Sequence, residues 1–331
     1  IGVVCAGSGS KTIIYSDGKS YGSAIAGIAL RAGVRASLSG GDISIATKVA
    51  DAGHITQTIG STESGSSAQA TALGGIAVVG LSFSAHLELT GSVRIGVTVS
   101  SNSLVRQQLH PHSASVALFG VSAFSRWLNT PSASSHTMGI FHNINIAADV
   151  RDNSEIKSTV GVLRGGLALL GLSICDLGGT ASVIITNSSD ASVSIANQSV
   201  IEVHITDELN SPFRAVALAG SFALYANSGH AMFAGKTRHT VVQVSSQSKV
   251  RFVTSESTDV LESVAIGGSV SVLSAGNTAS CTDQGSRFIG HLDGSDMHFA
   301  VGNTSGVLAA LSLFGGIAVV SQSGDVSVNI T

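Results

Sequence analysis

The sequence predicts an all-β protein built as one repeat array, and three observations carry this prediction. A strand-like motif, in which a small pair precedes an apolar run, recurs along the whole chain, most clearly in Leu73–Leu89. Charged residues make up 11% of the chain and aromatic residues 5%, whereas charged residues usually make up about a quarter of a soluble protein. Gly, Ser, Ala, Val, Ile and Thr dominate instead, and this mixture favours strands that pack closely through small side chains.

One apolar residue follows each small pair and marks the start of a repeat. These anchor residues are Ile28, Ile76, Val121, Leu167, Phe222, Val270 and Ile317. They lie about 45 to 55 residues apart, and a period of this size over a whole chain indicates a repeat architecture. Residues 1–331 therefore form a single array, divided into 1–27 (partial), 28–75, 76–120, 121–166, 167–221, 222–269, 270–316 and 317–331 (partial).

The elements of each repeat follow from residue alternation. Residues 1–27 are expected to form two short strands, IGVVCA and KTIIYS, before a turn at Ser16-Asp17-Gly18. In the fourth repeat, Leu167–Ile174 is the anchor strand. Three alternating segments follow it, at Ala181–Thr186, Ala191–Ala196 and Val200–Thr206, separated by corners rich in Ser, Asn and Gly. Alternation of this kind predicts strands with one buried and one wet face.

The anchor strands differ because they are apolar on both faces. Ile76 and Val78 lie on one face of such a strand, and Ala77 and Val79 lie on the other. A strand of this composition is expected to be buried on both sides. Its second face needs a cover, either a neighbouring chain or a packed second sheet, since each uncovered bulky side chain forfeits about 1.5–3 kcal/mol. We therefore expect the seven anchors to act as assembly anchors.

Two architectures fit the period. The preferred one is a β-solenoid, in which each unit of about 48 residues forms one large coil or two smaller ones. The alternative is a seven-bladed β-propeller with four strands per blade. Aromatic and charged residues are sparse and no Trp-Asp signature recurs, which favours the solenoid.

The Gly pairs at Gly74-Gly75, Gly165-Gly166 and Gly315-Gly316, with Ser and Asn corners between alternating strands, resemble repetitive secreted β-solenoid surface proteins of the adhesin or surface-filament type. The resemblance covers nearly the whole chain in composition and rhythm. It implies an extended rod at the cell surface or outside the cell, with no catalytic centre. Its expected partners are like chains, in a homo-oligomer or filament, or other surface proteins. No functional residue can be carried over from it.

Charge and hydropathy exclude some classes of protein. The formal charge is −3 and no basic stripe occurs, so we expect no nucleic-acid partner. No apolar run reaches the ~18–20 residues that span a bilayer as a helix. Because the chain lacks an initiator Met, we expect it to be processed or part of something longer. Cys5, Cys175 and Cys281 form no disulfide or metal framework, so they are expected to be small buried thiols.

The sequence holds no nucleophile elbow, zinc-binding helix motif or paired-acid spacing, so we expect no enzyme, no cofactor and no metal site. A binding module for glycans or proteins is the second hypothesis. Its ligand loops would be Arg106–Ser113 and Arg126–Met138. The candidate residues there are Arg106, His110, His112, Arg126 and Trp127.

Three further groups of residues are candidates. Asp149, Arg151 and Asp152 form a compact charged group, which supports a third hypothesis, a polysaccharide-active β-helix enzyme. The stretch His291–His298 could hold a metal ion through His and Asp, although Asp293-Gly294 more simply forms a corner. Acceptor sites for N-linked glycans occur at Asn187, Asn197, Asn303 and Asn329.

Overall fold

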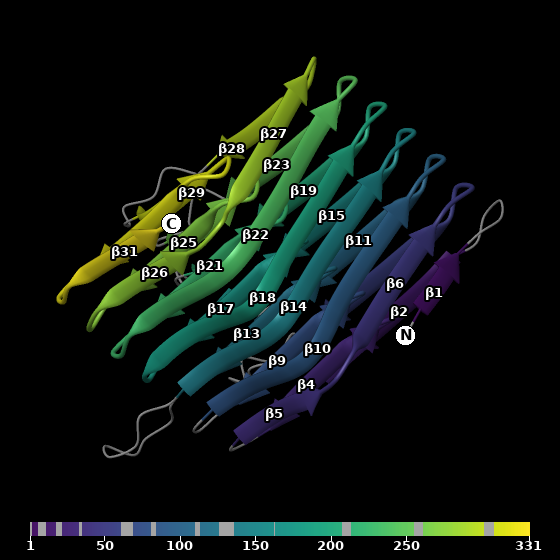
Figure 1. Cartoon of the computed structure of the whole chain (residues 1–331). Coiled ribbons are helices and arrows are strands. Elements are labelled where there is room, and N and C mark those ends of the chain that lie inside the picture. The colour runs from purple at the N-terminus through teal and green to yellow at the C-terminus, as the bar shows by residue number, and fades with distance from the viewer. Residues whose placement is uncertain are drawn as a thin grey trace.

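The chain is a parallel β-solenoid of seven stacked coils (Figure 1). The computed structural model describes residues 2–5, 11–17, 22–32, 35–60, 69–80, 84–109, 113–125, 136–161, 163–206, 213–254, 261–300 and 308–331. Each coil contributes to four sheets, and strands of successive coils pair in parallel. The expected solenoid is confirmed, and the propeller alternative is wrong because propeller blades pair their strands within one repeat.

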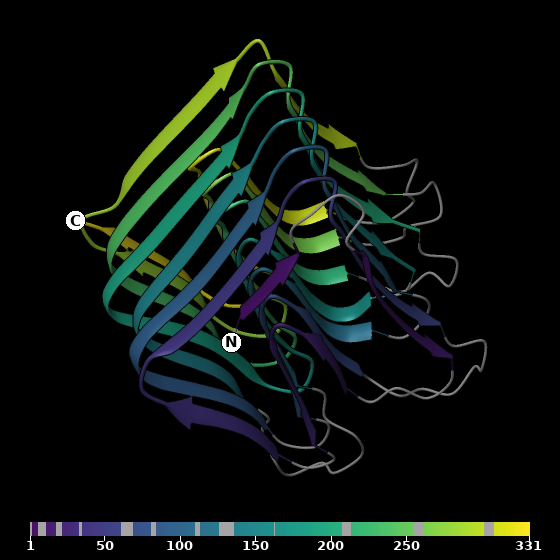
Figure 2. The ribbon, with the colours of Figure 1, turned by 90° about the vertical axis from the view of Figure 1, so that its right-hand side faces the viewer.

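Sheet A is the bent outer sheet, and Figure 2 shows its long strands along one side of the stack. In four coils its strand is continuous, and at the ends it is divided in two. Its strands are β1 (Gly2–Cys5), β5 (Arg35–Gly40), β6 (Ile43–Val49), β10 (Ser84–Val99), β14 (His136–Val150), β18 (Thr180–Ile195), β22 (Ala231–Ser245), β26 (Ala279–Asp283), β27 (Arg287–Asp293) and β31 (Val326–Ile330).

Sheet B follows sheet A after a tight corner. Its strands are β2 (Lys11–Asp17), β7 (His54–Gly60), β11 (Leu104–Leu109), β15 (Glu155–Val160), β19 (Val200–Ile205), β23 (Lys249–Thr254) and β28 (Asp296–Ala300). From β11 onwards its side chains alternate, with apolar residues turned to the core and polar residues to solvent. This is the pattern that the sequence predicts for the strands after each anchor.

Sheets C and D complete the coil and are joined by the small-pair turn. Sheet C contains β3 (Gly22–Ile25), β8 (Gln69–Leu73), β12 (Ser113–Leu118), β16 (Leu163–Leu169), β20 (Phe213–Leu218), β24 (Leu261–Ile266) and β29 (Leu308–Leu313). Sheet D contains β4 (Ile28–Ala32), β9 (Ile76–Gly80), β13 (Val121–Ser125), β17 (Leu172–Asp176), β21 (Phe222–Ala226), β25 (Val270–Ser274) and β30 (Ile317–Ser321).

The strands of sheet D are buried on both faces, as the anchor pattern predicts. In β9, β13, β17, β21 and β25 every residue is buried. One face joins the main core with sheet A, where the Phe222 and Phe233 ring centroids lie 5.3 Å apart. The other face packs on sheet C through a second cluster made largely of alanine. The cover of the anchor strands is therefore a second sheet of the same chain.

Serine hydroxyls cross the interface between sheets C and D. Ser115 Oγ donates to Ser122, with 2.9 Å between the two hydroxyl oxygens. The same pair recurs three coils later, where Ser263 Oγ lies 2.9 Å from Ser271 Oγ. Small side chains with short hydrogen bonds let the two sheets approach closely, which larger side chains would prevent.

The turn between sheets C and D places a residue in the left-handed region. Phe119 and Leu170 are fully buried there, with φ of 53° and 55°. A glycine follows each of them, and a Cβ on Gly120 would lie 2.5 Å from the carbonyl oxygen of Gly171 in the next coil. The glycine of the turn is thus required because the turns of neighbouring coils stack closely on one another.

Two expectations about the fourth repeat need correction. Leu167 lies in sheet C rather than in the anchor column, and Leu172 pairs with Val121 instead. The stretch holds a further glycine after Leu170, and the turn uses Leu170-Gly171 rather than Gly165-Gly166. The corner expected at Asn187–Asp190 is also absent, because β18 runs continuously through a register shift between Ile185 and Ser188. A bulge bends a strand without ending it.

The turn stacking predicts that Gly120→Ala destabilises the protein by about 1–3 kcal/mol, since backbone atoms leave no room for a methyl group. Gly96→Ala is the matched control, because a Cβ at this strand position meets nothing within 4 Å. Urea unfolding followed by circular dichroism measures both changes. Equal stability of the two variants would contradict the close approach of the turns.

Candidate functional site

The most regular polar feature of the molecule is the corner between sheets A and B. In each of the four coils from β10 to β23, two consecutive residues there have φ between 56° and 62°. These pairs are Ser101-Asn102, Asp152-Asn153, Asn197-Gln198 and Ser246-Gln247. Short polar side chains occupy this left-handed region more easily than most residues. The corner that the sequence predicts between Ala196 and Val200 is confirmed.

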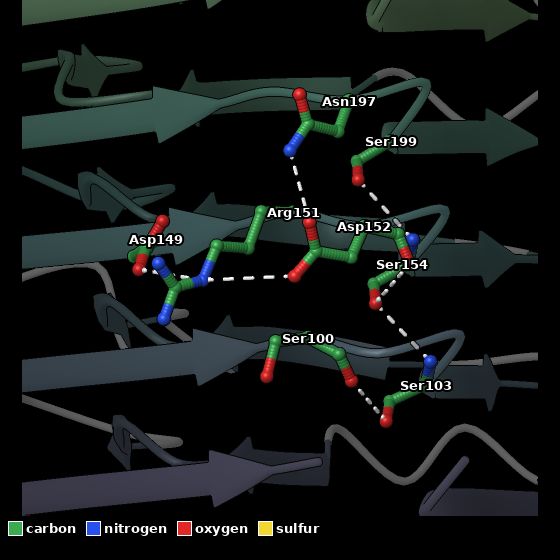
Figure 3. A network of polar contacts seen from close by, with 8 residues as sticks. All are labelled: Ser100, Ser103, Asp149, Arg151, Asp152, Ser154, Asn197 and Ser199. Atoms are coloured by element: carbon green, nitrogen blue, oxygen red, sulfur yellow. Dashed lines mark hydrogen bonds and ion pairs between the residues drawn. The ribbon is translucent and has the colours of Figure 1, made fainter. Parts of the chain in front are cut away.

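A ladder of buried serines runs beneath these corners (Figure 3). Its members are Ser103, Ser154, Ser199 and Ser248, each 1% exposed or less. The backbone N–H of each serine donates to the Oγ of the serine one coil further on, at 3.1 or 3.2 Å. In the first of these coils, Ser103 Oγ also donates to the Ser100 carbonyl at 2.6 Å. The ladder satisfies polar groups that would otherwise be buried without partners.

The exposed surface of the corner carries the charged group that the sequence singles out. Arg151 Nε lies 3.5 Å from a carboxylate oxygen of Asp149 and 3.9 Å from one of Asp152. Asp152 also accepts a hydrogen bond of 2.9 Å from the Asn197 amide (Figure 3). These side chains are about half exposed, so the pairs contribute little stability. The structure brings the three charges together but pairs them with one another.

Two shallow hollows lie on either side of this cluster. One has a volume of about 530 Å³ and lies over the corners, lined by Asp152, Asn153, Asn197, Gln198, Ser246 and Gln247. The other is a groove of about 460 Å³ on the outer face of sheet A. Its floor is a register column of small residues, Ala46, Gly96, Ala147 and Ser192. The next outward column flanks the floor with polar groups, among them Lys48 and Asp149. The groove thus runs along the stack across the strands β6, β10, β14 and β18.

Most residues of the proposed ligand loops cannot be located on the structure. Arg106 is exposed on the outer face of β11. His110, His112, Arg126 and Trp127 lie outside the described residues. The loop hypothesis therefore stays a prediction. The two hollows lie on sheet A and its corner, where the sequence singles out only the charged group of Asp149, Arg151 and Asp152 as a candidate catalytic group.

The histidine–aspartate stretch near the carboxyl end forms a corner, as the simpler interpretation predicts. Gly294 has φ of 53° and separates β27 of sheet A from β28 of sheet B. His291 and His298 consequently belong to different sheets. Among the described residues, no group of three or more His, Cys, Asp or Glu side chains could hold a metal ion. No described helix is long and apolar enough to cross a bilayer.

Three of the four candidate glycosylation residues are described. Asn187 lies on β18 and its amide donates to Asn143 Oδ1 at 2.8 Å. Asn197 is exposed in a corner, and Asn329 is exposed on β31. Asn303 lies outside the described residues.

The anchor residues lie inside the chain. Ile76, Val121 and Val270 are fully buried, and Phe222 is 3% exposed. Ile28 and Ile317 are partly buried, because they belong to the first and last described strands of sheet D.

The structure reveals two buried ionic groups that the sequence gives no sign of. Arg238 and Asp283 are 3% and 0% exposed and form an ion pair of 2.9 Å. Arg238 also donates to the Gly268 carbonyl at 2.7 Å. In sheet C, Arg214 of β20 pairs with Glu262 of β24, and it donates to the hydroxyl of Tyr225 on β21 at 3.0 Å. Both arginines hold adjacent coils together, since Asp283 and Glu262 each lie one coil further on than the arginine that they pair with.

Cys175 and Cys281 are buried free thiols, as expected, whereas the side chain of Cys5 lies outside the described residues. The pKa of Cys281 is raised to about 12, first by burial and then by the Asp283 charge, while the Arg238 charge opposes both. Burial likewise raises the pKa of the Cys175 thiol well above its usual range. Thiols held in the neutral form are poor nucleophiles.

Comparison of the chain with protein-family models, with curated proteins and with solved structures finds no match.

The serine ladder predicts that Ser154→Ala destabilises the protein by about 1–3 kcal/mol, because the Ser103 N–H loses its acceptor in a buried position. Ser192→Ala is the matched control, as Ser192 is exposed on sheet A; it should change stability by no more than about 0.5 kcal/mol. Urea unfolding measures both values. An unchanged unfolding midpoint for Ser154→Ala would show that the serine ladder contributes nothing to the stability of the protein.

Proposed function

We propose that this chain is a non-catalytic structural or adhesive protein of the cell surface or extracellular space. In this proposal it forms a rigid β scaffold that self-associates or joins a surface filament. The observation that carries the proposal is the continuity of the stack: four parallel sheets run through all seven coils and enclose one apolar core.

Stiffness follows from bonds that run along the stack as well as within each coil. The backbone ladders of four sheets cross every junction between coils. Inside the core, Gln107 donates to Gln57 one coil back at 2.9 Å. Ser158 in the next coil donates to Gln107 at 3.3 Å. Because bending the rod would strain all of these bonds at once, the assembly suits a mechanical role.

The described polar groups support a role without a chemical step. The buried thiols are held neutral. The exposed side chains of Asp149 and Asp152 both pair with Arg151. Each of these charges therefore has a partner within the group.

An extracellular setting agrees with the exposed acceptor residues. Asn197 and Asn329 lie on the surface of the stack within the Asn-x-Ser/Thr pattern. Glycans attached there would project away from the core.

The groove over sheet A supports a second candidate function, the binding of an extended polymer such as a glycan. Its floor of Ala46, Gly96, Ala147 and Ser192 is flat and its flanking column is polar. A polymer strand laid along the stack could contact each coil in turn. Adhesion to a glycan would use the same scaffold, so the two candidates differ in partner rather than in fold.

Incubation with a panel of polysaccharides tests both candidates. We expect no depolymerisation, and antibodies should label the chain on unpermeabilised cells. Chain cleavage of any glycan, or labelling only after permeabilisation, would contradict the proposed function. If a glycan binds without cleavage, Ala147→Trp should weaken binding by at least about tenfold, because the indole fills the groove. Thr159→Trp, on the outer face of sheet B, is the matched control and should leave binding unchanged.

A further inference from the structure

We propose that His86, His136 and Met138 form a binding site for a soft monovalent metal ion, Cu(I) or Ag(I), on the outer face of sheet A. The site lies where β10 pairs with β14, and both strands have a further paired neighbour on their other side. The sequence alone predicts no metal site here, because His86 and Met138 belong to different repeats and only the register joins them. The inference goes beyond the proposed scaffold function and does not depend on it.

Parallel pairing brings the three donor side chains together. His86 of β10 lies directly beside Met138 of β14 in the register of sheet A. The residues before and after each of them are buried in the core, so strand alternation turns both side chains outward. His136 lies two residues before Met138 on the same outer face, ~7 Å along the strand. Because adjacent strands are ~4.8 Å apart, an ion above the two strands can reach all three side chains.

The His86 ring has a nitrogen without a partner. Its Nε2 atom is buried and forms no hydrogen bond with the described residues. By contrast, His142 on the outer face of β14 is paired with Thr186 of the next coil, with 3.1 Å between Nδ1 and Oγ1. His86 has the thioether of Met138 beside it instead, and this sulfur is a weak hydrogen-bond acceptor. A buried nitrogen without a partner is unfavourable, and coordination to a metal ion would remove that penalty.

The donor set selects a soft ion. Thioether sulfur favours Cu(I), and imidazole nitrogen is also a ligand of copper. Zinc is bound by imidazole, thiolate and carboxylate rather than by thioether, and calcium and magnesium take oxygen ligands. Glu88, two residues beyond His86, lies beside Ile140 and adds a negative charge at the edge of the site, which favours a cation.

A second methionine in the same outward column provides an internal comparison. The column continues from Met138 through Ser182 to Met232 and Ser280. Met232 also has a histidine two residues before it, His230. Serines, however, lie beside it in both neighbouring strands. Met232 therefore repeats the spacing of the site without the histidine that lacks a partner.

Competition with a chromogenic Cu(I) chelator, under anaerobic conditions, measures the affinity. The full chain carries Cys5→Ser so that this thiol does not compete, while Cys175 and Cys281 are buried. We expect one ion per chain. Met138→Leu and His86→Asn should each raise the dissociation constant at least about tenfold, since each removes a donor. Met232→Leu is the matched control and should leave the dissociation constant unchanged.

Thermal unfolding gives an independent readout. Because the ion would join β10 to β14, it would hold two coils together, and the unfolding midpoint should rise with the concentration of free ion. Ag(I) serves as the probe, since it needs no reductant. The rise should persist in Met232→Leu and disappear in Met138→Leu. Without metal, circular dichroism should show equal strand content in all variants, because the substituted side chains lie on the outer face.

Several results would overturn the proposal. They are a chain that takes no Cu(I) from the chelator, an affinity that Met138→Leu leaves unchanged, and an equal loss of affinity in Met232→Leu. Binding of Zn(II) as tight as that of Cu(I) and insensitive to Met138→Leu would indicate a site made by the histidines alone, and it would also overturn the thioether site. None of these results bears on the scaffold function, which the polysaccharide panel and cell labelling test separately.

Discussion

The close approach of sheets C and D through small side chains is the constraint on which the rest of the structure depends. Ala117, Ser115 and Ser122 fill the interface, and Gly120 lets the turn stack on its neighbour. Larger side chains would push the sheets apart. Sheet A covers one face of sheet D and sheet C covers the other. Sheets C and D can therefore lie inside the coil, with sheets A and B outside. A repeat of about 48 residues is the length needed for this arrangement.

Polar groups inside such a coil are tolerated because each coil supplies partners for the next. The serine ladder beneath the corners and the Gln57–Gln107 contact both run along the stack. An isolated coil would bury the same donors without acceptors, at a cost of about 1–3 kcal/mol for each one. Cooperation between coils therefore stabilises the stack, and the proposed scaffold role depends on it.

The sequence predicted the solenoid and the two-sided burial of sheet D because both depend on local pattern. The assignment of Leu167 as an anchor was wrong, since the turn uses Leu170-Gly171 and not the more conspicuous Gly165-Gly166 pair. Asn187 seemed to mark a corner, but paired neighbours keep β18 continuous. The ion pair of Arg238 with Asp283 joins residues 45 positions apart, and no local pattern signals such a contact. The groove was missed because its floor of small residues appears only when coils are aligned in register.

Hydrogen exchange measured by mass spectrometry tests the central claim most directly. If sheet D is enclosed between sheets A and C, the amides of β13, β17 and β21 should exchange most slowly in the protein. The amides of β11, β15 and β19 in sheet B, which has one face in solvent, should exchange faster. Exchange in sheet D as fast as in sheet B would show that sheet C does not cover it, and would contradict the account given above.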